Sequence, residues 1–224
     1  MMDENYLDKY KERREQREQK KEKELKLTDL IEVSILQQIQ DSFSNMTGLA
    51  ALTTDKNGTP VTKGSNFSDF CINHIRTSKK GNQRCEECDK KGAERTLETG
   101  RFCTYNCHAG LVDFAAPIMA GGKMVGSFIG GQVLSQKPDI EKFRKIAKDL
   151  VIDEDGLVEA VQNVTIRSKE RIDSAADFLF VTANILSNIA YTSYKLHLSN
   201  IEIEESSQRK SDFLANMSHE IRTP

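Results

Sequence analysis

A stretch of the chain from residue 157 to residue 223 contains no residue that interrupts a helix. Neither proline nor glycine occurs from Leu157 until Pro224, and these are the residues that a helix interior tolerates least. Mostly apolar or small residues recur within this run in alternating steps of four and three, which is typical of a coiled-coil seam. We predict a coiled-coil helix over residues 166–209. Because a helix of about 55 residues would extend roughly 80 Å, we expect two chains to pair as a parallel homodimer. The seam positions are Ile172, Ala176, Leu179, Ala183, Leu186, Ala190, Ser193 and His197.

Composition divides the rest of the chain into a charged arm and a globular part. The hydrophobic fraction is 38%, below the ~45–50% of ordinary globular chains. Residues 1–26 contain few core-forming side chains and place Glu three or four positions from Lys or Arg, as in Glu18 and Lys21. This pattern predicts a charged N-terminal helix, either a solvated arm or a coiled-coil lead-in. We expect the compact domain over residues 27–165.

Charge and hydropathy exclude several classes of protein. The net charge is -2, and basic and acidic residues are mixed along the chain, so no basic stripe indicates a nucleic-acid partner. The sequence has no run of ~20 apolar residues, and we expect no membrane segment. Met1–Asp8 lacks the basic and apolar regions of a signal peptide. These features predict a cytoplasmic protein.

Turn signals predict an α+β domain built around one antiparallel sheet. Asn57-Gly58 follows the β-prone segment 49–54 and indicates a tight turn into a second short strand. Gly121-Gly122 separates two apolar runs, 111–119 and 124–134, which we expect to form a second hairpin. Helices are predicted on either side of these strands, notably from Leu30 to Ile39, over 141–150 and over 156–164. Strands at both ends with helices between them favour an α+β domain in which helices flank one antiparallel sheet, followed by the long C-terminal helix.

The C-terminal segment 213–224, FLANMSHEIRTP, resembles the H-box of histidine kinases. The resemblance implies that residues 210–224 begin a kinase dimerisation and phospho-acceptor domain. It implies that His219 is the phospho-acceptor, that Glu220 is its acid/base partner, and that Thr223 orients water during dephosphorylation of a response regulator. A neutral imidazole near pH 7 suits nucleophilic attack on ATP. The ATP-binding domain is expected only in a full-length kinase, so this chain alone is expected to be inactive.

Ordered sequence blocks between Leu27 and Leu134 resemble the PocR-type sensory domain, a variant of the PAS-like fold. The resemblance implies a sensor of small molecules, since the family is linked to small hydrocarbon derivatives such as short diols. The blocks are DKNG at 55–58, NFSDFC at 66–71, RCEECD at 84–89, CHAGLVDFAAPI at 107–118 and GGQ at 130–132.

All five cysteines lie between Cys71 and Cys107, and in a reducing compartment such a cluster favours metal binding or reactive thiols over disulfides. Cys85-x2-Cys88 and Cys103-x3-Cys107 have the spacing of two ligand pairs for Zn or an iron–sulfur cluster. Cys71 or His108 is a possible substitute for one ligand. A haem-attachment motif is a poorer match, because Cys103 and Cys107 enclose three residues where two are usual. Ligand- or redox-reactive thiols and inert buried cysteines remain alternatives.

Apolar residues of the predicted core are also candidates to line a ligand cavity. Two polar residues, His108 and Asp113, are expected to face a hydroxylated ligand within it. For each of these residues a purely structural role remains the alternative. The apolar candidates are Phe67, Phe70, Phe114, Ile118 and Phe128.

Together these features predict the sensory input module of a two-component histidine kinase. It would bind a small organic metabolite and relay the signal through a dimeric coiled coil to His219, with a response regulator as the downstream partner. The alternative is a redox or metal sensor in which the cysteine cluster is the receptor. A DNA-binding regulator is not favoured, since no helix-turn-helix pattern follows the sensory segment.

Overall fold

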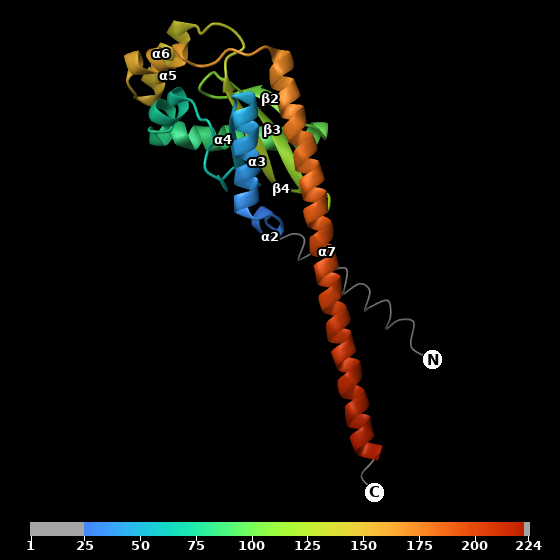
Figure 1. The fold of residues 1–224 in the computed structure, drawn as a ribbon. Helices are drawn as coiled ribbons and strands as arrows, with labels where there is room; N and C mark the ends of the chain where they lie inside the picture. Colours follow the sequence, from blue (N-terminus) through green and yellow to red (C-terminus); the bar gives the residue numbers. More distant parts are fainter. Residues whose placement is uncertain (1–24, 222–224) are drawn as a thin grey trace.

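The computed structural model describes residues 25–221, and for residues 212, 213 and 215–221 it describes the backbone alone. The helix predicted over residues 1–26 therefore lies almost entirely outside the described residues. The described chain forms an α+β domain from which one long helix extends (Figure 1). No helix in this part of the chain is long and apolar enough to cross a membrane.

Four antiparallel strands form the central sheet in the order β1-β4-β3-β2. The 111–134 hairpin is confirmed, with Gly121 and Gly122 at φ +57° and +77° in the turn between its strands. The Asn57-Gly58 turn is also present, with Gly58 at φ +84°. The chain after it pairs with β1 only at isolated bridges, such as Thr54 with Pro60. The strands are β1 (Ala50–Asp55), β2 (Cys103–Asn106), β3 (Val112–Ala120) and β4 (Lys123–Val133).

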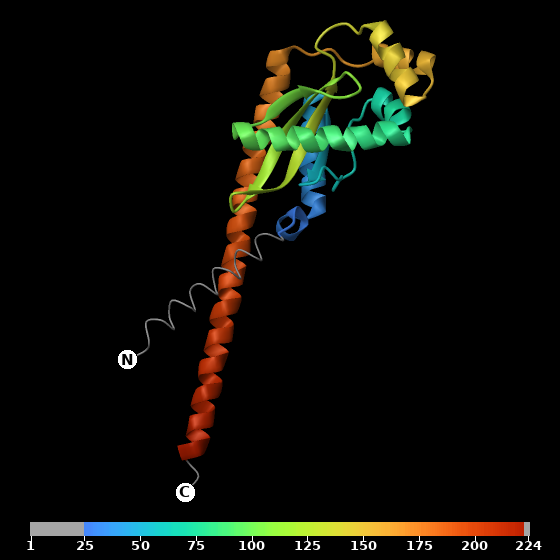
Figure 2. The same cartoon turned by 180° about the vertical axis from the view of Figure 1, so that it is seen from behind.

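Helices cover both faces of this sheet. α3 and α7 lie on one face (Figure 1), and α4 crosses the opposite face (Figure 2). The predicted first helix is interrupted at Ile31–Glu32, so that it forms a short α2 and a longer α3. The helices are α2 (Leu27–Leu30), α3 (Val33–Thr47), the π-helix η1 (Phe70–Ile75), α4 (Lys79–Thr99), α5 (Ile140–Leu150), α6 (Glu154–Gln162) and α7 (Lys169–Ile221).

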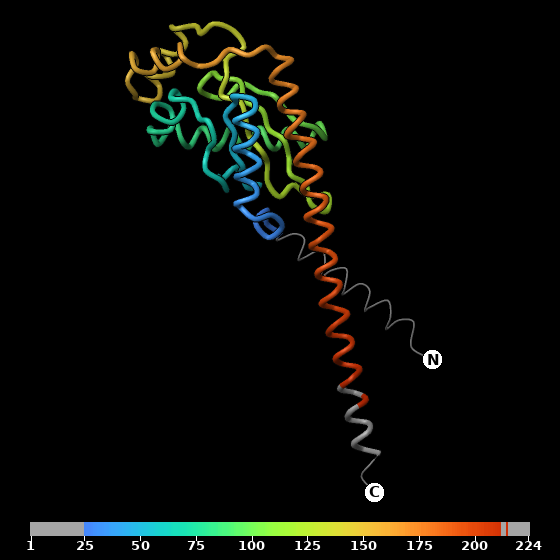
Figure 3. The backbone as a smooth tube through the Cα atoms, in the orientation of Figure 1, coloured from blue at the N-terminus to red at the C-terminus, as the bar shows by residue number. Residues whose placement is uncertain are grey.

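Helices α5 and α6 form an excursion that returns to its starting point, as the backbone trace shows (Figure 3). Asp139 and Asp153 cap their first turns through side-chain oxygens, as is typical of N-cap residues. The Leu134 N–H donates to the Thr165 carbonyl at 3.0 Å, and the Arg167 N–H donates to the Leu134 carbonyl at 2.9 Å. The excursion is thus closed at its base, directly before α7 begins.

Helix α7 is continuous over 53 residues, which confirms the long helix that the sequence predicts. The first four of its predicted seam positions, however, pack within the domain. Ile172, Ala176, Leu179 and Ala183 are at most 1% exposed, and they belong to the main core between the sheet, α3 and α7. Since these positions pack within their own chain, they cannot also contact a second chain. The spacing of the hydrophobic residues cannot tell packing on a sheet from packing on a second helix, because both require the same apolar stripe.

Candidate functional site

Four polar residues come together on the face of the sheet that α4 covers. We call Arg76, Asp89, Tyr105 and Asp113 the polar cluster. Arg76 follows η1, while the other three lie in α4, β2 and β3 respectively. Asp89, Tyr105 and Asp113 are only 5%, 7% and 8% exposed, and the charges of both carboxylates act on the Tyr105 hydroxyl. Segments distant in sequence thus form one buried polar site.

A backbone irregularity holds Asp113 in this site. The pairing of β3 with β4 shifts register between Val112 and Asp113, and Gln132 has φ +56°, in the left-handed region that favours glycine. The Gln132 N–H donates to Asp113 Oδ1 at 2.7 Å, and its side-chain oxygen accepts from the Ser68 N–H at 2.9 Å. Bulges and backbone strain of this kind cluster beside functional sites. Gln132 therefore ties the sheet to the segment that enters η1, and π-helices also occur frequently at functional sites.

Arg76 is the positive charge of the polar cluster. Its Nη2 lies 3.4 Å from Asp89 Oδ2, with side-chain exposures of 17% and 7%, and its guanidinium lies 5.3 Å from the centre of the Phe67 ring. Burial raises the pKa of Asp89 to about 7, assisted by the Asp113 charge and opposed by Arg76. Burial likewise raises the pKa of Asp113 to about 6. One guanidinium thus faces two carboxyl groups that take up protons near neutral pH.

Several atoms of this region are buried without a hydrogen-bond partner. Among the described residues, four buried side-chain atoms lack one, and three of them are Arg76 Nε, the Tyr105 hydroxyl and His108 Nδ1. Leaving such an atom unpaired costs about 1–3 kcal/mol, so native structures contain few of them. Their concentration in one place indicates a site that is suited to binding a polar molecule.

Gly92 allows Tyr105 to lie directly against α4. A Cβ atom at position 92 would be 2.4 Å from Cε1 and 2.8 Å from the hydroxyl of Tyr105. Any side chain there would displace the ring, because the interior has no free volume to absorb the overlap. The glycine therefore sets the position of the Tyr105 hydroxyl.

Three cysteines and His108 adjoin the polar cluster. Cys85 Sγ lies 3.3 Å from His108 Nε2. The backbone N–H of His108 donates to Cys88 Sγ at 3.3 Å, and the Cys107 thiol hydrogen-bonds to Asp113. Burial raises the pKa of Cys85 to about 12 and that of Cys107 well above its usual value. These thiols are therefore protonated at neutral pH, whereas the thiolate is the form that reacts or binds a metal. Burial, followed by the charges of Arg84 and Arg76, lowers the pKa of His108, which favours a neutral imidazole.

The structure does not bring the predicted metal ligands together as one set. Cys103 Sγ is directed to the Thr104 carbonyl at 3.8 Å, and Cys71 is buried in the apolar cluster formed by η1, α5 and α6. Among the side chains that the structure describes, no three of His, Cys, Asp or Glu are arranged to hold a metal ion. Of the candidate ligands, Cys85 Sγ lies 3.3 Å from the His108 ring, at Nε2, whereas Cys88 Sγ contacts only the His108 backbone N–H.

The apolar residues predicted to line one cavity are distributed over three clusters. Phe114, Ile118 and Phe128 are fully buried in the core beneath α3 and α7. Phe70 packs with η1, α5 and α6, while Phe67 contacts the small cluster around Tyr105. Only Phe67 is therefore a neighbour of the polar cluster, through Arg76.

The predicted phospho-acceptor segment lies at the far end of α7. His219 and Glu220 belong to its last helical turn, but their side chains are not among the described ones, and Thr223 lies outside the described residues. The structure thus gives the backbone path from the domain to His219 and no geometry for its chemistry.

The raised carboxyl pKa values predict how stability depends on pH. Because Asp89 and Asp113 hold protons more tightly when folded, they stabilise the fold most below pH 4, and this stabilisation is lost as the pH rises through about 6 to 7. Asp89→Asn mimics the protonated form. Relative to the natural chain, the free energy of unfolding of this variant should rise by about 2–4 kcal/mol when the pH is raised from 4.5 to 7.5. Urea denaturation at the two pH values measures the change. An equal difference at both pH values would contradict a buried, proton-binding Asp89.

Sequence reasoning identified Asp113 and His108 but not Arg76, Asp89 or Tyr105. Asp89 and Tyr105 lie in or beside quoted motifs, yet hydrophobic periodicity assigns charged residues to the solvent side of a helix. The one available signal is Gly92, three residues beyond Asp89 in α4, since a glycine inside a helix often marks a close contact.

The chain is similar in sequence to a known family of domains and to a known regulatory protein. The family described as "Sensory domain found in PocR" matches residues 29–191. The chain is also 29% identical, over 146 residues, to "Regulatory protein PocR" of Salmonella typhimurium, an alignment that covers 65% of this chain and 48% of that protein. The chain thus spans about half the length of this relative. The matched residues include the sheet, the polar cluster, the α5–α6 excursion and the first part of α7.

Proposed function

Because the chain belongs to the family of PocR-type sensory domains, we propose that it is the sensory input module of a cytoplasmic two-component histidine kinase. It binds a small polar organic molecule and relays binding through α7 to the phospho-acceptor His219. ATP is used by the catalytic domain of the full-length kinase, and a response regulator receives the phosphoryl group. The observation that carries the receptor assignment is the polar cluster, with its buried atoms that lack hydrogen-bond partners.

The chemistry of the cluster favours a neutral ligand. An added anion would face Asp89 and Asp113, and an added cation would face Arg76, so either would be buried beside a like charge. Arg76 Nε is a donor, whereas the Tyr105 hydroxyl can both donate and accept. Hydroxyl and carbonyl groups match these atoms, which favours short diols, aldehydes and related compounds.

The route from the cluster to α7 is short. Cys85 and Cys107 pack against the apolar cluster of η1, α5 and α6, and the base of the α5–α6 excursion joins Leu134 to Thr165 and Arg167. A ligand that shifts η1 or α4 therefore acts on the residues that precede α7. For signalling, the ligand must bind two arrangements of this connection with different affinity.

A ligand screen with a matched control tests this proposal. Short diols, aldehydes and organic acids are titrated onto the purified chain while its melting temperature is followed. We expect at least one neutral compound to stabilise the natural chain and the Tyr194→Phe control, but not Tyr105→Phe, which loses only the buried hydroxyl. If no compound stabilises the chain, or if Tyr105→Phe responds normally, the cluster is not the receptor.

The dimer that this function requires has a candidate surface on the outer side of α7. We call five exposed apolar residues of this side the outer stripe: Val181, Ile185, Ile189, Leu196 and Ile203, which are 47%, 58%, 63%, 62% and 63% exposed. They fall on one side of a helix of 3.6 residues per turn. Helix α7 extends beyond the domain (Figure 1), and Leu196 and Ile203 of the stripe lie in its second half. A second copy of α7 in parallel register is therefore the partner that we propose.

The outer stripe predicts how a charge affects assembly. Ile185→Glu places a carboxylate on the apolar stripe without entering the core, so we expect weaker association by about tenfold or more and nearly unchanged unfolding of the domain. Sedimentation equilibrium measures the association. Gln208→Glu, which adds the same charge at an exposed position on the opposite side of α7, is the control. If both variants associate as strongly as the natural chain, the outer stripe does not form the dimer interface.

The second candidate function is a redox or metal sensor, and the 3.3 Å contact between Cys85 Sγ and His108 Nε2 favours it. Any bound Zn or iron would require the thiols of Cys85 and Cys88 to lose their protons, which burial opposes. Elemental analysis together with a visible spectrum distinguishes the cases. A metal at one equivalent per chain, or absorption near 400 nm, would support this candidate.

A further inference from the structure

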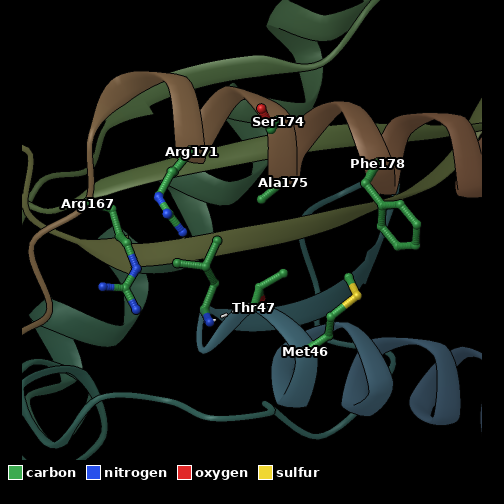
Figure 4. Close-up of a pocket in the computed structure, with 8 residues that line it drawn as sticks. Met46, Thr47, Arg167, Arg171, Ser174, Ala175 and Phe178 are labelled. Carbon is green, nitrogen blue, oxygen red and sulfur yellow. Dashed lines mark hydrogen bonds between the residues drawn. The ribbon is translucent and has the colours of Figure 1, made fainter.

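A cavity of about 360 Å³ lies where the end of α3 meets the start of α7. It shares no lining residue with the polar cluster, which lies on the face of the sheet that α4 covers. Figure 4 shows its two sides: Met46 and Thr47 come from the α3 side, whereas Arg167, Arg171 and Phe178 come from α7 or the residues before it. Its volume lies at the lower end of the range of ligand pockets, ~300–1,000 Å³. We call it the arginine groove. Its lining is completed by Leu49, Ser174 and Ala175.

The positive charge of the arginine groove is not neutralised by a carboxylate within residues 25–221. The Arg167 side chain donates one weak hydrogen bond, to the Ile166 carbonyl at 3.4 Å, and among the described side chains no ion pair joins either arginine to an acid. Three acids lie in this part of α7, and each has another partner. Glu170 hydrogen-bonds with the Ser168 side chain and with its own backbone. Asp173 pairs with Lys169 at 2.7 Å, and Asp177 pairs with Arg101 at 2.9 Å.

The other end of the arginine groove is apolar. Met46 and Phe178 are 66% and 49% exposed, although the Phe178 ring stacks on the buried Phe43 ring with centroids 6.4 Å apart. The groove hydroxyls are already committed: Thr47 donates to the Phe43 carbonyl and Ser174 to the Glu170 carbonyl, both at 2.8 Å. The available recognition groups are therefore the two guanidinium groups and the apolar surface next to them.

We propose that the arginine groove is a second ligand site, which binds a small organic anion: a carboxylate or phosphate attached to a short apolar group. Guanidinium groups hold such heads through paired, charge-assisted hydrogen bonds. The apolar group would cover Phe178 and Met46. This ligand class differs from the neutral one proposed for the polar cluster, so the two sites can be tested separately.

A ligand in the arginine groove would act on the start of α7, because the groove lies where α7 joins the domain. Arg167 is joined to the base of the α5–α6 excursion by its backbone, and Arg171 lies in the first turns of α7. A ligand that binds here contacts α3 and α7 together, and it would therefore fix α7 against the domain.

Isothermal titration calorimetry on the complete chain tests the site with octanoate, octyl phosphate, inorganic phosphate and 1-octanol. We expect octanoate and octyl phosphate to bind, with inorganic phosphate weaker and 1-octanol not binding. Arg171→Gln should weaken octanoate binding by about tenfold or more. Lys169→Gln, which removes the same charge two residues away outside the groove, should retain it, and Arg167→Gln serves as a second groove variant.

Three results would overturn the proposal. They are equal loss of binding in Lys169→Gln and Arg171→Gln, equal affinity for 1-octanol and octanoate, and binding to phosphatidylglycerol vesicles without binding of either free anion. The last result would assign the arginines to a lipid surface. Unchanged urea midpoints in the variants, expected because Arg171 is exposed, ensure that lost binding does not reflect unfolding.

Discussion

Replacing Ala183 by glutamate is expected to lower the free energy of unfolding by about 4 kcal/mol or more. Ala183 is 0% exposed and faces the sheet from α7 in the main core. The larger side chain must displace its neighbours, and its charge is buried without a cation. Both effects belong to the few mechanisms that produce large single-residue losses of stability. Urea denaturation followed by circular dichroism measures the change.

Ile185→Glu, only two residues further along, is the matched control. Its side chain is 58% exposed, so we expect a change within about 0.5 kcal/mol. If Ala183→Glu instead leaves the domain stable and only separates two chains, the seam contacts a partner and the observed packing is wrong.

Replacing Arg76 by alanine is the second change with a large expected effect. Asp89 and Asp113 then remain buried without their cation, and we expect a loss of about 3–5 kcal/mol at pH 8. At pH 5 the loss should be smaller, because both carboxyls, whose pKa values are raised to about 7 and 6, are then largely neutral. Urea denaturation at the two pH values measures the difference.

Two variants separate this effect from a general loss of charge. Arg84→Ala removes a guanidinium that contacts Asp149 on the surface, and we expect a loss below about 1 kcal/mol at either pH. Adding Asp89→Leu to Arg76→Ala should restore part of the stability at pH 8, since it removes a stranded charge. A loss from Arg76→Ala that is independent of pH would show that the cluster carboxyls do not titrate as proposed.

The sequence allowed most of the fold to be predicted where local chemistry decides it. Gly121-Gly122 sets the turn of the central hairpin because both residues have positive φ, and the absence of proline and glycine permits the continuous α7. The break at Ile31–Glu32 has no such local signal. It depends on the burial of Leu27 and Ile31 in the main core.

The partner of an apolar stripe was not predictable in the same way. Leu179 and Ala183 have the spacing of a coiled coil, and the same spacing suits packing on a sheet. The site was recognised in part through Asp113 and His108, whereas Arg76 and Asp89 look like surface charges in the sequence. Only the three-dimensional contact of Arg76, directly after η1, with Asp89 of α4 makes them a largely buried pair.

The central claim is that the polar cluster is the receptor and α7 is the output, and hydrogen exchange of backbone amides tests it most directly. Exchange is measured on the natural chain and on Tyr105→Phe, with and without the compound of the screen that raises the melting temperature most. The account predicts slower exchange in η1 and α4, and altered exchange at 166–172 where α7 begins, in the natural chain alone. Unchanged exchange at 166–172, or the same response in Tyr105→Phe, would contradict it.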